Sequence, residues 1–337
     1  MLIPFIIKKR DSRQFFLTIF TPSKFYCVQI HYDLDNFKAL NPVVTIGTFD
    51  GVHLGHREVI TELKHLTTLS GGESVVFTFE PHPRIVISPQ EDSLRLLSTK
   101  EEKIKLMEKM GVDHLVIYPF TKEFSRLTYN EFVKEILVER MNISSLVVGY
   151  DHRFGQGRQG DFHSLEMLSR SLNFKVEQLS QLVVDNKVVS STKIRQALEE
   201  GDISKANHFL GYRYALTGKV VEGNRLGRTI GFPTANIDTC DRHKLVPGDG
   251  VYAVTIELAG KRFNGMLNIG VRPTVNSNAD HKTIEVHILN FDEDIYTSEI
   301  TAIFVEKIRD EQKFENIEQL KAQIKKDQVI ALDIFSK

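Results

Sequence analysis

The stretch VVTIGTFDGVHLGH, residues 43–56, places an apolar strand directly before a glycine-rich turn that contains two histidines. The apolar run at 43–47 predicts a buried strand, and an amphipathic helix is expected from His56 to Thr68. The same unit of strand and helix then recurs through the first half of the chain. Further strands are expected at 75–79, 114–118 and 145–149, and further helices at 98–111 and 129–140.

Both later helices carry start signals, the capping boxes Ser98-x-x-Glu101 and Thr128-x-x-Glu131, and Gly111 suits a left-handed cap. Alternating strands and helices of this length imply right-handed crossovers and a parallel sheet with helices on both faces. We therefore predict a doubly wound, Rossmann-like α/β domain. Ligands of such sheets bind beyond the carboxyl ends of the strands.

The pattern changes after SSTKIRQALEEG at 190–201 and a short helix that ends near Gly211. Strand-like stretches now alternate with turns rich in Gly, Pro and Asn, which is typical of an antiparallel β-barrel or sandwich. A final amphipathic helix is expected at 317–326. The domain boundary falls between 189 and 212. The expected strands are YALTGKVV, GVYAVTIEL, KRFNGMLNIG, TIEVHIL and ITAIFVEKI.

Composition indicates a chain of about two globular domains, because 337 residues exceed the usual size of one. Lys and Arg number 43 against 44 for Asp and Glu, which gives a formal net charge of −1. No global field therefore attracts nucleic acid or an anionic membrane, and we expect neither as a partner. A polyanionic ligand must be held by local groups.

The amino terminus carries its apolar residues before Lys8, Lys9 and Arg10, which is the reverse of a secretory signal. No apolar run approaches the ~20 residues of a membrane-spanning helix. Residues 1–26 are an N-terminal extension of uncertain status. Cys27 and Cys240 lie far apart without metal-type spacing, so we expect a reducing cytoplasm.

The turn GTFDGVHLGH, residues 47–56, holds two imidazoles beside glycines that allow close approach of a ligand. A nucleotide phosphate at a helix N-terminus suits such a turn. Its HxGH core resembles the signature of the nucleotidyltransferase superfamily. The alternative is a tight turn with surface histidines, but the flanking GTFDG at the first strand–helix junction favours function. The ATP-binding candidates here are Gly47, Phe49, Asp50 and Gly55, and the catalytic candidates are His53 and His56.

A second candidate element, SSTKIRQAL, places Ser191, Thr192, Lys193 and Arg195 at a helix start. Hydroxyls and cations at this position suit phosphate, and Arg195 can clamp two oxygens. An ordinary serine cap with a solvated basic face explains the residues equally well in isolation. The superfamily carries a similar ISSTxIR-like element that closes over ATP, which favours the functional interpretation.

The loop VVGYDHRFGQGRQGD, residues 147–161, formally contains GxGxxG at Gly155, Gly157 and Gly160. A dinucleotide fingerprint needs its first glycine directly after a strand and its third opening a helix, so we reject that interpretation. A polar loop at a strand's carboxyl end is a substrate-binding candidate, and a solvated loop is about as good an account. Asp151 and Phe154 are its flavin or ATP candidates.

In the second domain, GNRLGRTIGFPTANI at 223–237 combines a glycine-rich basic loop with a hydroxyl and an amide. Gly227 and Arg228 suit phosphates, whereas Thr234 and Asn236 suit a hard cation such as Mg²⁺. No Walker motif occurs, which excludes a P-loop kinase. Glu285 lies on an expected strand, and its two neighbours should face the opposite side. Glu285 is therefore either a solvent-facing residue or a base that points into a pocket.

Eight motifs together resemble the prokaryotic bifunctional riboflavin kinase/FMN adenylyltransferases, also called FAD synthetases. The match covers roughly residues 27 to 337, with small departures at Thr48 and Asn290. It implies an adenylyltransferase domain at 27–200, a linker helix at 201–211 and a riboflavin kinase barrel at 212–337. In order, the motifs are GTFDGVHLGH, FTFEPHP, VVGYDHRFGQGRQGD, SSTKIRQAL, GRTIGFPTANI, GVYAV, NIGVRPT and TIEVHIL.

The resemblance implies two reactions, phosphorylation of riboflavin to FMN by ATP, then adenylylation of FMN by a second ATP to FAD and pyrophosphate. It makes Glu285 the general base and Thr234 and Asn236 ligands of Mg²⁺ and ATP. His53 and His56 stabilise charge on the phosphates. Ser191, Thr192, Arg195 and Arg228 assist at phosphates, and Arg309 matches a stretch near the flavin.

Two other functions remain open at this point. One is an adenylyltransferase for a different phosphorylated substrate, with the β-domain as a binding module. The other is a flavin-binding sensor that no longer turns over. Metal ligands and a base in the barrel argue against the first, and the intact candidate residues argue against the second. Partners are expected to be small molecules, with a weak homo-oligomer left open.

Overall fold

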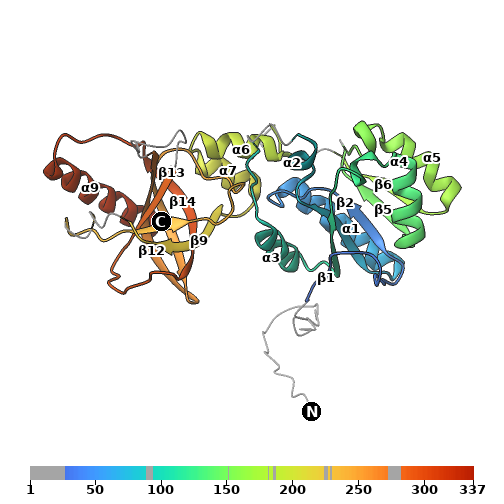
Figure 1. Cartoon of the computed structure of the whole chain (residues 1–337), viewed down its shortest axis with the longest axis horizontal. Coiled ribbons are helices and arrows are strands. Elements are labelled where there is room, and N and C mark those ends of the chain that lie inside the picture. The colour runs from blue at the N-terminus through green and yellow to red at the C-terminus, as the bar shows by residue number, and fades with distance from the viewer. Residues whose placement is uncertain are drawn as a thin grey trace, which may run out of the picture.

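A computed structural model describes residues 27–88, 94–150, 152–180, 182–184, 187–223, 227, 230–271 and 282–337, leaving aside the side chains of residues 187 and 271. The extension at 1–26 lies outside the described residues. Figure 1 shows a parallel-sheet body and a barrel, with two helices between them, α6 (Ser191–Glu199) and α7 (Ile203–Leu210). Among the described residues, no helix is both long enough and apolar enough to span a membrane.

The first domain is built on a six-stranded sheet in the order β1-β4-β3-β2-β5-β6, and every neighbouring pair is parallel. The carboxyl ends of all six strands therefore lie along one edge. The turn at 47–53 leaves β2 at this edge. The strands are β1 (Gln29–His31), β2 (Val43–Ile46), β3 (Ser74–Glu80), β4 (His114–Pro119), β5 (Ser145–Val148) and β6 (Lys175–Gln178).

Helices cover both faces of this sheet. Along β3, Val75 and Phe77 belong to one buried cluster with Leu137, whereas Val76 belongs to another with Ile60. Alternate strand residues thus feed two cores, as helices on both faces require, and the predicted doubly wound fold is confirmed. The helical elements are α1 (Leu54–Ser70), α2 (Pro83–Ile87), η1 (Phe124–Arg126), α3 (Lys100–Met110), α4 (Tyr129–Glu131), η2 (Phe132–Arg140), η3 (Gln156–Arg158) and α5 (Phe162–Leu172).

The start of α3 differs from the prediction by one residue. Thr99, not Ser98, caps the helix, and its capping-box partner is Glu102, not Glu101. The reason is that the Ser98 hydroxyl accepts a hydrogen bond from Gly51 N at 3.0 Å, in the turn after β2. A residue that looked like a cap instead joins two segments of the first domain.

The second predicted capping box is confirmed, since Thr128 and Glu131 bond reciprocally. The helix that follows is not wholly α-helical, because η2 (Phe132–Arg140) is a π-helix. α1 begins two residues before the predicted start, since His53 takes the cap position. Gly111 adopts the predicted left-handed conformation, with φ of 66°.

The second domain is a closed antiparallel barrel in the order β10-β13-β12-β11-β14-β9, which confirms the barrel alternative. Along β13, Ile284, Val286 and Ile288 are buried, and Glu285 between them is half-buried on the other side. The strands are β9 (Ala215–Val221), β10 (Ala235–Asp238), β11 (Gly250–Leu258), β12 (Lys261–Val271), β13 (Lys282–Ile288) and β14 (Glu299–Arg309).

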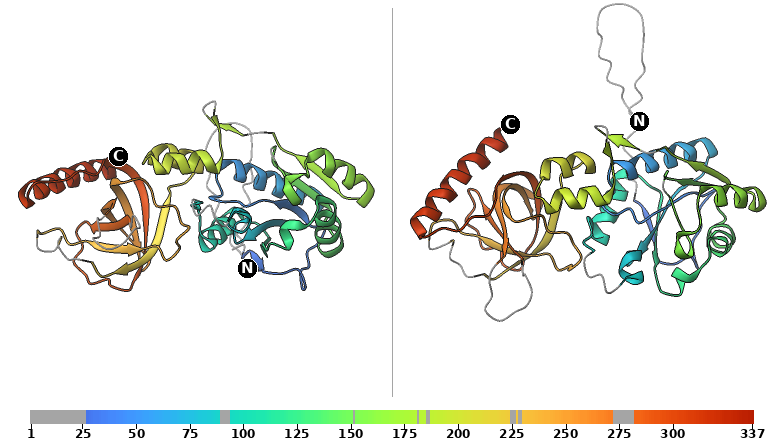
Figure 2. Two further views of the ribbon diagram at one scale, coloured as in Figure 1. Left: turned by 45° about the horizontal axis from the view of Figure 1, so that its top comes forward. Right: turned by 90° about the horizontal axis from the view of Figure 1, so that it is seen from above.

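Helices α6 and α7 share the barrel's hydrophobic core, in which Ile194 and Phe209 join barrel residues such as Val254. The Asn207 side chain strengthens this packing by donating to Phe304 O and accepting from Tyr214 N. Figure 2 shows both helices between the barrel and the sheet domain. A small hairpin, β7 (Val183–Val184) and β8 (Lys187–Val188), precedes α6.

The terminal helix α9 (Ile317–Ser336) packs beside the barrel and continues well beyond the predicted end at 326. Asp327 on this helix is buried and accepts three hydrogen bonds from Arg309 at 2.8–3.0 Å. Gln323 adds a fourth at 2.8 Å. Arg309 thus holds α9 against the end of β14. The predicted contact of Arg309 with the flavin stays a prediction.

Replacing Asp327 with Asn should lower the free energy of unfolding of the barrel by about 3 kcal/mol, because the Arg309 guanidinium, which is only 19% exposed, is left without its counter-ion. The matched control is Asp333→Asn, which removes an exposed pair with Lys337 on the same helix and should cost below about 1 kcal/mol. Urea unfolding followed by circular dichroism compares them. Equal effects of the two changes would contradict a structural role for the buried pair.

Candidate functional site

The turn after β2 is held by Asp50, whose side chain is almost fully buried. Its Oδ1 accepts hydrogen bonds from Leu97 N at 2.8 Å and Ser98 N at 3.1 Å. Its Oδ2 lies 2.6 Å from Nη2 of Arg195 on α6. The carboxylate therefore joins three segments that are distant in sequence, and its predicted contact with ATP stays a prediction.

The two histidines of the HxGH motif lie together at the start of α1. His53 caps the helix by accepting from His56 N through Nδ1 at 3.3 Å. The two rings stack with their centroids 3.7 Å apart and their planes 14° from parallel, and the Phe49 ring lies 5.1 Å from that of His56. The structure thus brings together residues that the motif predicted to act as a unit.

Two glycines make this close arrangement possible. Gly51 has a φ of 78°, and a Cβ there would lie 2.9 Å from side-chain atoms of Leu97. A Cβ on Gly55 would lie 3.2 Å from the His53 ring. Gly47 completes the turn by donating its N–H to Phe77 O at 3.0 Å.

Burial holds the pKa of His56 well below its usual value, and the neighbouring His53 and Lys103 lower that pKa further. His56 is therefore neutral near pH 7. Its Nδ1 is buried and has no hydrogen-bond partner in the described part of the chain. A buried polar atom of this kind has a desolvation cost that a bound ligand group would relieve.

Lys103 is a member of this site that the sequence analysis missed. It lies on α3 with only 7% of its surface exposed, and burial lowers its pKa, while Asp50 and Glu80 oppose that shift. Among the described residues its ammonium makes no hydrogen bond or ion pair. The sequence signal for its burial was its position four residues before Met107, because residues four apart share one face of a helix and Met107 faces the core.

The start of α6 reaches the same turn. Ser190 caps the helix, and Ser191 Oγ donates to Asp50 O at 3.2 Å. Arg195 uses its Nε to bond Arg95 O at 2.7 Å, besides its contact with Asp50. Thr192 is exposed. The structure therefore places the second predicted element beside the first, and their predicted phosphate contacts stay predictions.

The loop after β5 is anchored by Phe154, which is buried against Tyr129 and Phe132. Phe154 also pairs with Gly160 in an antiparallel bridge, and Asp161 caps the next helix. Gly160 therefore does not open a helix, as a dinucleotide fingerprint would require. The flavin role of Phe154 stays a prediction. The other candidate in this loop, residue 151, lies outside the described residues.

His82 is a second buried titratable group near this turn, in a motif that sequence analysis quoted without assigning it a role. Its Nδ1 accepts from Arg84 N at 3.2 Å and so caps α2. Burial lowers the pKa of His82 to about 4, against the opposing influence of Asp50. The imidazole is therefore neutral in the folded protein across the physiological range.

The barrel holds a separate group of candidates on β10, β13 and the segment before β10. Thr234 Oγ1 lies 3.4 Å from Glu285 Oε2. Asn236 is the direct partner of Glu285 across the β10–β13 ladder. Sequence analysis placed these three residues in two motifs about fifty positions apart, and the closed barrel brings them side by side.

The glycine-rich loop approaches this group closely. A Cβ on Gly227 would lie 3.1 Å from Thr234 Oγ1, and a Cβ on Gly223 would lie 2.0 Å from Asn236 Nδ2. Gly227 O also accepts from Phe232 N at 2.8 Å. The predicted phosphate ligand at position 228 lies outside the described residues.

A pocket opens beside Thr234 on the barrel wall, with a volume of about 60 Å³. Its lining combines apolar side chains with three consecutive carboxylates. The negative charge of these carboxylates makes the pocket itself better suited to a neutral base or sugar than to phosphate groups. The lining includes Val220, Pro233, Ala235, Val286, Ile288, Phe291, Asp292, Glu293, Asp294, Ile295 and Tyr296.

Each half of the chain matches a known protein family. The family profile described as FAD synthetase matches residues 37–193, and that described as riboflavin kinase matches residues 210–335. The bifunctional riboflavin kinase/FMN adenylyltransferase of Escherichia coli (strain K12) is 37% identical over 87% of this chain and 92% of that protein. The protein of the same name from Haemophilus influenzae is 39% identical, covering 87% and 94%.

A solved structure from Streptococcus pneumoniae, described as a macrolide-efflux protein, has a TM-score of 0.82 and 30% identity. The alignment covers 90% of this chain and 98% of that one. The architecture of that structure extends over both domains of this chain. The name macrolide-efflux protein describes the Streptococcus pneumoniae protein.

An HxGH turn on a parallel sheet, joined to a barrel with a threonine–glutamate pair, defines a two-domain transferase that acts on phosphate groups. With both family profiles and these relatives, the chain belongs to the bifunctional riboflavin kinase/FMN adenylyltransferase family. It is a riboflavin kinase and an FMN adenylyltransferase. The sensor and the adenylyltransferase for another substrate are not favoured.

Replacing His82 with Asn should remove a part of the protein's sensitivity to acid, while the Asn side chain keeps the cap of α2. The folded pKa of about 4 lies below the unfolded value of 6.5, so the unfolded chain binds the proton more readily. The stabilisation is complete above about pH 6.5 and is lost progressively as the pH falls to about 4, by about 3 kcal/mol.

Urea unfolding at several pH values measures this effect. The difference in unfolding free energy between wild type and His82→Asn should shrink on acidification through that range. A difference that stays constant from pH 7.5 to pH 4.5 would show that His82 does not titrate as its burial requires.

Proposed function

We propose that the two reactions are divided between the two sites, riboflavin phosphorylation at Glu285 in the barrel and FMN adenylylation at His53 and His56 in the sheet domain. The observation that carries this division is the Thr234–Glu285 contact of 3.4 Å, which provides a carboxylate beside a hydroxyl in the barrel. That pair lies in a different domain from the stacked histidines.

In the kinase site, Glu285 orients the ribityl 5′-hydroxyl of riboflavin and accepts its proton. The hydroxyl oxygen forms a bond to the γ-phosphorus of ATP, and the bond from that phosphorus to the β-phosphate oxygen breaks, releasing ADP. Such transfers depend mainly on positioning and on neutralising charge. Gly227 itself lies close to Thr234, so its backbone can approach the phosphates.

The donor set fits Mg²⁺ in part. Thr234 offers a hydroxyl and Asn236 an amide oxygen, and both are hard oxygen ligands. Within the described residues, no cluster of three or more His, Cys, Asp and Glu side chains could hold a metal. Mg²⁺ usually binds through few protein oxygens, with phosphates and waters completing the shell, and it would supply charge neutralisation at the transferred phosphoryl group.

In the adenylyltransferase site, an oxygen of the FMN phosphate forms a bond to the α-phosphorus of ATP. The bond from that phosphorus to the β-phosphate oxygen breaks, and pyrophosphate leaves. His53 accepts a backbone N–H through Nδ1, so its neutral form carries the proton on Nε2, from which it can donate to a phosphate oxygen. His56, which is neutral and whose Nδ1 has no hydrogen-bond partner among the described residues, lies beside it.

Lys103 fits the same site as a phosphate-binding cation. Its ammonium is buried near His56 and lacks a hydrogen bond or ion pair in the described part of the chain. A buried cation is costly unless it is paired. A triphosphate in the turn would supply the missing negative charge, and Ser191 and Arg195, which both contact Asp50, would assist.

We propose small flavins and ATP as the ligands and a cytoplasmic location. Cys27 and Cys240 are both free and exposed, which suits a reducing compartment. The formal net charge of −1 gives no general attraction to nucleic acid. A weak homo-oligomer stays a prediction.

Replacing Glu285 with Gln should lower kcat for FMN formation by about 10²- to 10⁴-fold, because the amide cannot accept the hydroxyl proton. FAD formation from supplied FMN should stay within about twofold of wild type. The matched control is Glu257→Gln, which alters an exposed carboxylate paired with Arg262 on the same barrel. Separating the flavins chromatographically measures both reactions, and equal loss of both would contradict the division.

Replacing His53 with Asn should give the opposite result. Asn can cap α1 as His53 does, so stability should change little, but no imidazole remains to stabilise the phosphates. We expect FAD formation from FMN to fall about 10²- to 10³-fold while FMN formation continues, so that FMN accumulates. His65→Asn, a change farther along α1, is the control. Undiminished FAD formation would remove the HxGH turn from the reaction.

A further inference from the structure

The two domains are joined by a contact other than the chain connection. The segment before α3 runs beside residues 243–245 of the barrel domain, and Leu96 forms a parallel bridge with Lys244. Leu96 N donates to His243 O at 2.6 Å, and Leu245 N donates to Leu96 O at 2.8 Å. The kinase domain therefore pairs with the segment that contacts the adenylyltransferase turn.

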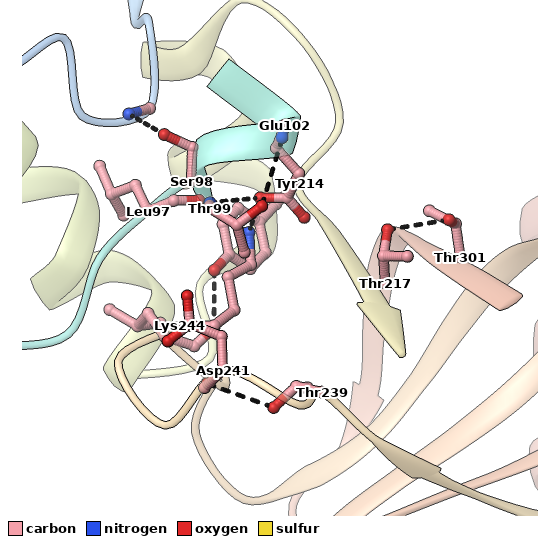
Figure 3. Close-up of polar contacts among 12 residues, drawn as sticks. Leu97, Ser98, Thr99, Glu102, Tyr214, Thr217, Thr239, Asp241, Lys244 and Thr301 are labelled. Carbon is pink, nitrogen blue, oxygen red and sulfur yellow. Dashed lines mark hydrogen bonds and ion pairs between the residues drawn. The ribbon is translucent and has the colours of Figure 1, made fainter. Parts of the chain in front are cut away.

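Lys244 is the charged centre of this contact, and it is almost fully buried. Its Nζ donates to Leu97 O at 2.8 Å and to Glu102 Oε2 at 2.5 Å (Figure 3). The ammonium also lies 4.5 Å from the ring centre of Tyr214. Burial lowers the pKa of Lys244, and the ion pair with Glu102 opposes that shift.

The same short segment holds the adenylyltransferase turn from its other side. Leu97 N and Ser98 N donate to Asp50 Oδ1, and Ser98 Oγ accepts from Gly51 N. Leu97 is thus bonded at both ends of its backbone, by its N–H to Asp50 and by its C=O to Lys244. A single residue lies between the barrel's lysine and the buried carboxylate of the turn.

We propose that Lys244, a residue of the kinase barrel, is a positioning residue for the adenylyltransferase site, acting through Leu97 and Glu102 on the turn around Asp50. This inference rests on the proposed assignment of adenylyl transfer to that turn. Lys244 touches no reacting group. It fixes the start of α3, the helix that carries Lys103, and the peptide groups that orient Asp50.

A buried cation that only joined the two domains would behave differently. Its loss would lower stability and would affect both activities or neither. A positioning role predicts that a change in the barrel damages the reaction of the other domain. Catalysis is sensitive to such displacement, since a misplacement of about 1 Å can cost about 10²-fold in rate.

The test is Lys244→Met, which keeps a long side chain and removes the charge. We expect kcat for FAD formation from supplied FMN to fall about tenfold or more, with the kinase kcat within about twofold of wild type. The control is Arg262→Met, which removes an exposed cation from the same barrel. Equal loss of both activities, or unchanged adenylyl transfer in a folded variant, would overturn the proposal.

Glu102→Gln provides a second variant in case Lys244→Met fails to fold. Gln preserves the capping box with Thr99 but not the ion pair with Lys244. It should also lower FAD formation selectively, and the double variant should be no worse than the poorer single one. Strict additivity, or a Glu102→Gln enzyme with normal adenylyl transfer, would contradict coupling through this pair.

A single assay distinguishes the assignment of the site from the positioning role of Lys244. If His53→Asn forms FAD normally, the assignment of the site itself is wrong. If His53→Asn is impaired but Lys244→Met and Glu102→Gln are not, the site is correct and the cross-domain role of Lys244 is wrong.

Discussion

The buried carboxylate of Asp50 is the constraint on which the proposed adenylyltransferase site depends. It accepts from Leu97 N and Ser98 N and pairs with Arg195, so the turn after β2, the start of α3 and helix α6 meet at one group. A carboxylate this buried is stable only when its oxygens are bonded. The GTFDG turn therefore cannot be regarded as a local motif, because its shape is determined by segments about fifty and about 145 residues away.

Much of the fold was predictable from sequence, because it rests on periodicity. The apolar runs of β2 and β3 and the alternation along β13 gave the correct sheet and barrel elements. Boundaries were harder where a side chain had two possible partners. Ser98 has the form of a helix cap, yet its hydroxyl bonds Gly51, and Thr99 takes the cap. Only the tertiary contact between Ser98 and Gly51 shows that Thr99, and not Ser98, caps the helix.

The sites were predictable to the extent that their residues lie in compact motifs. His53 and His56 are neighbours in sequence. The family resemblance assigned Thr234, Asn236 and Glu285 to one site, and the barrel brings the three residues together. Lys103 was not found, since a lysine in a charged helix suggests a solvated face, and its burial depends on packing against the turn. Lys244 is similar, because its partners belong to the other domain.

The kinase and adenylyltransferase activities of this chain act in sequence, with FMN as the product of the barrel and the substrate of the sheet domain. The most direct test incubates the purified full chain with riboflavin, ATP and Mg²⁺ and separates the flavins over time. The account predicts that FMN appears first and FAD follows after a lag. FAD that forms without FMN preceding it, or supplied FMN that is never converted, would contradict it.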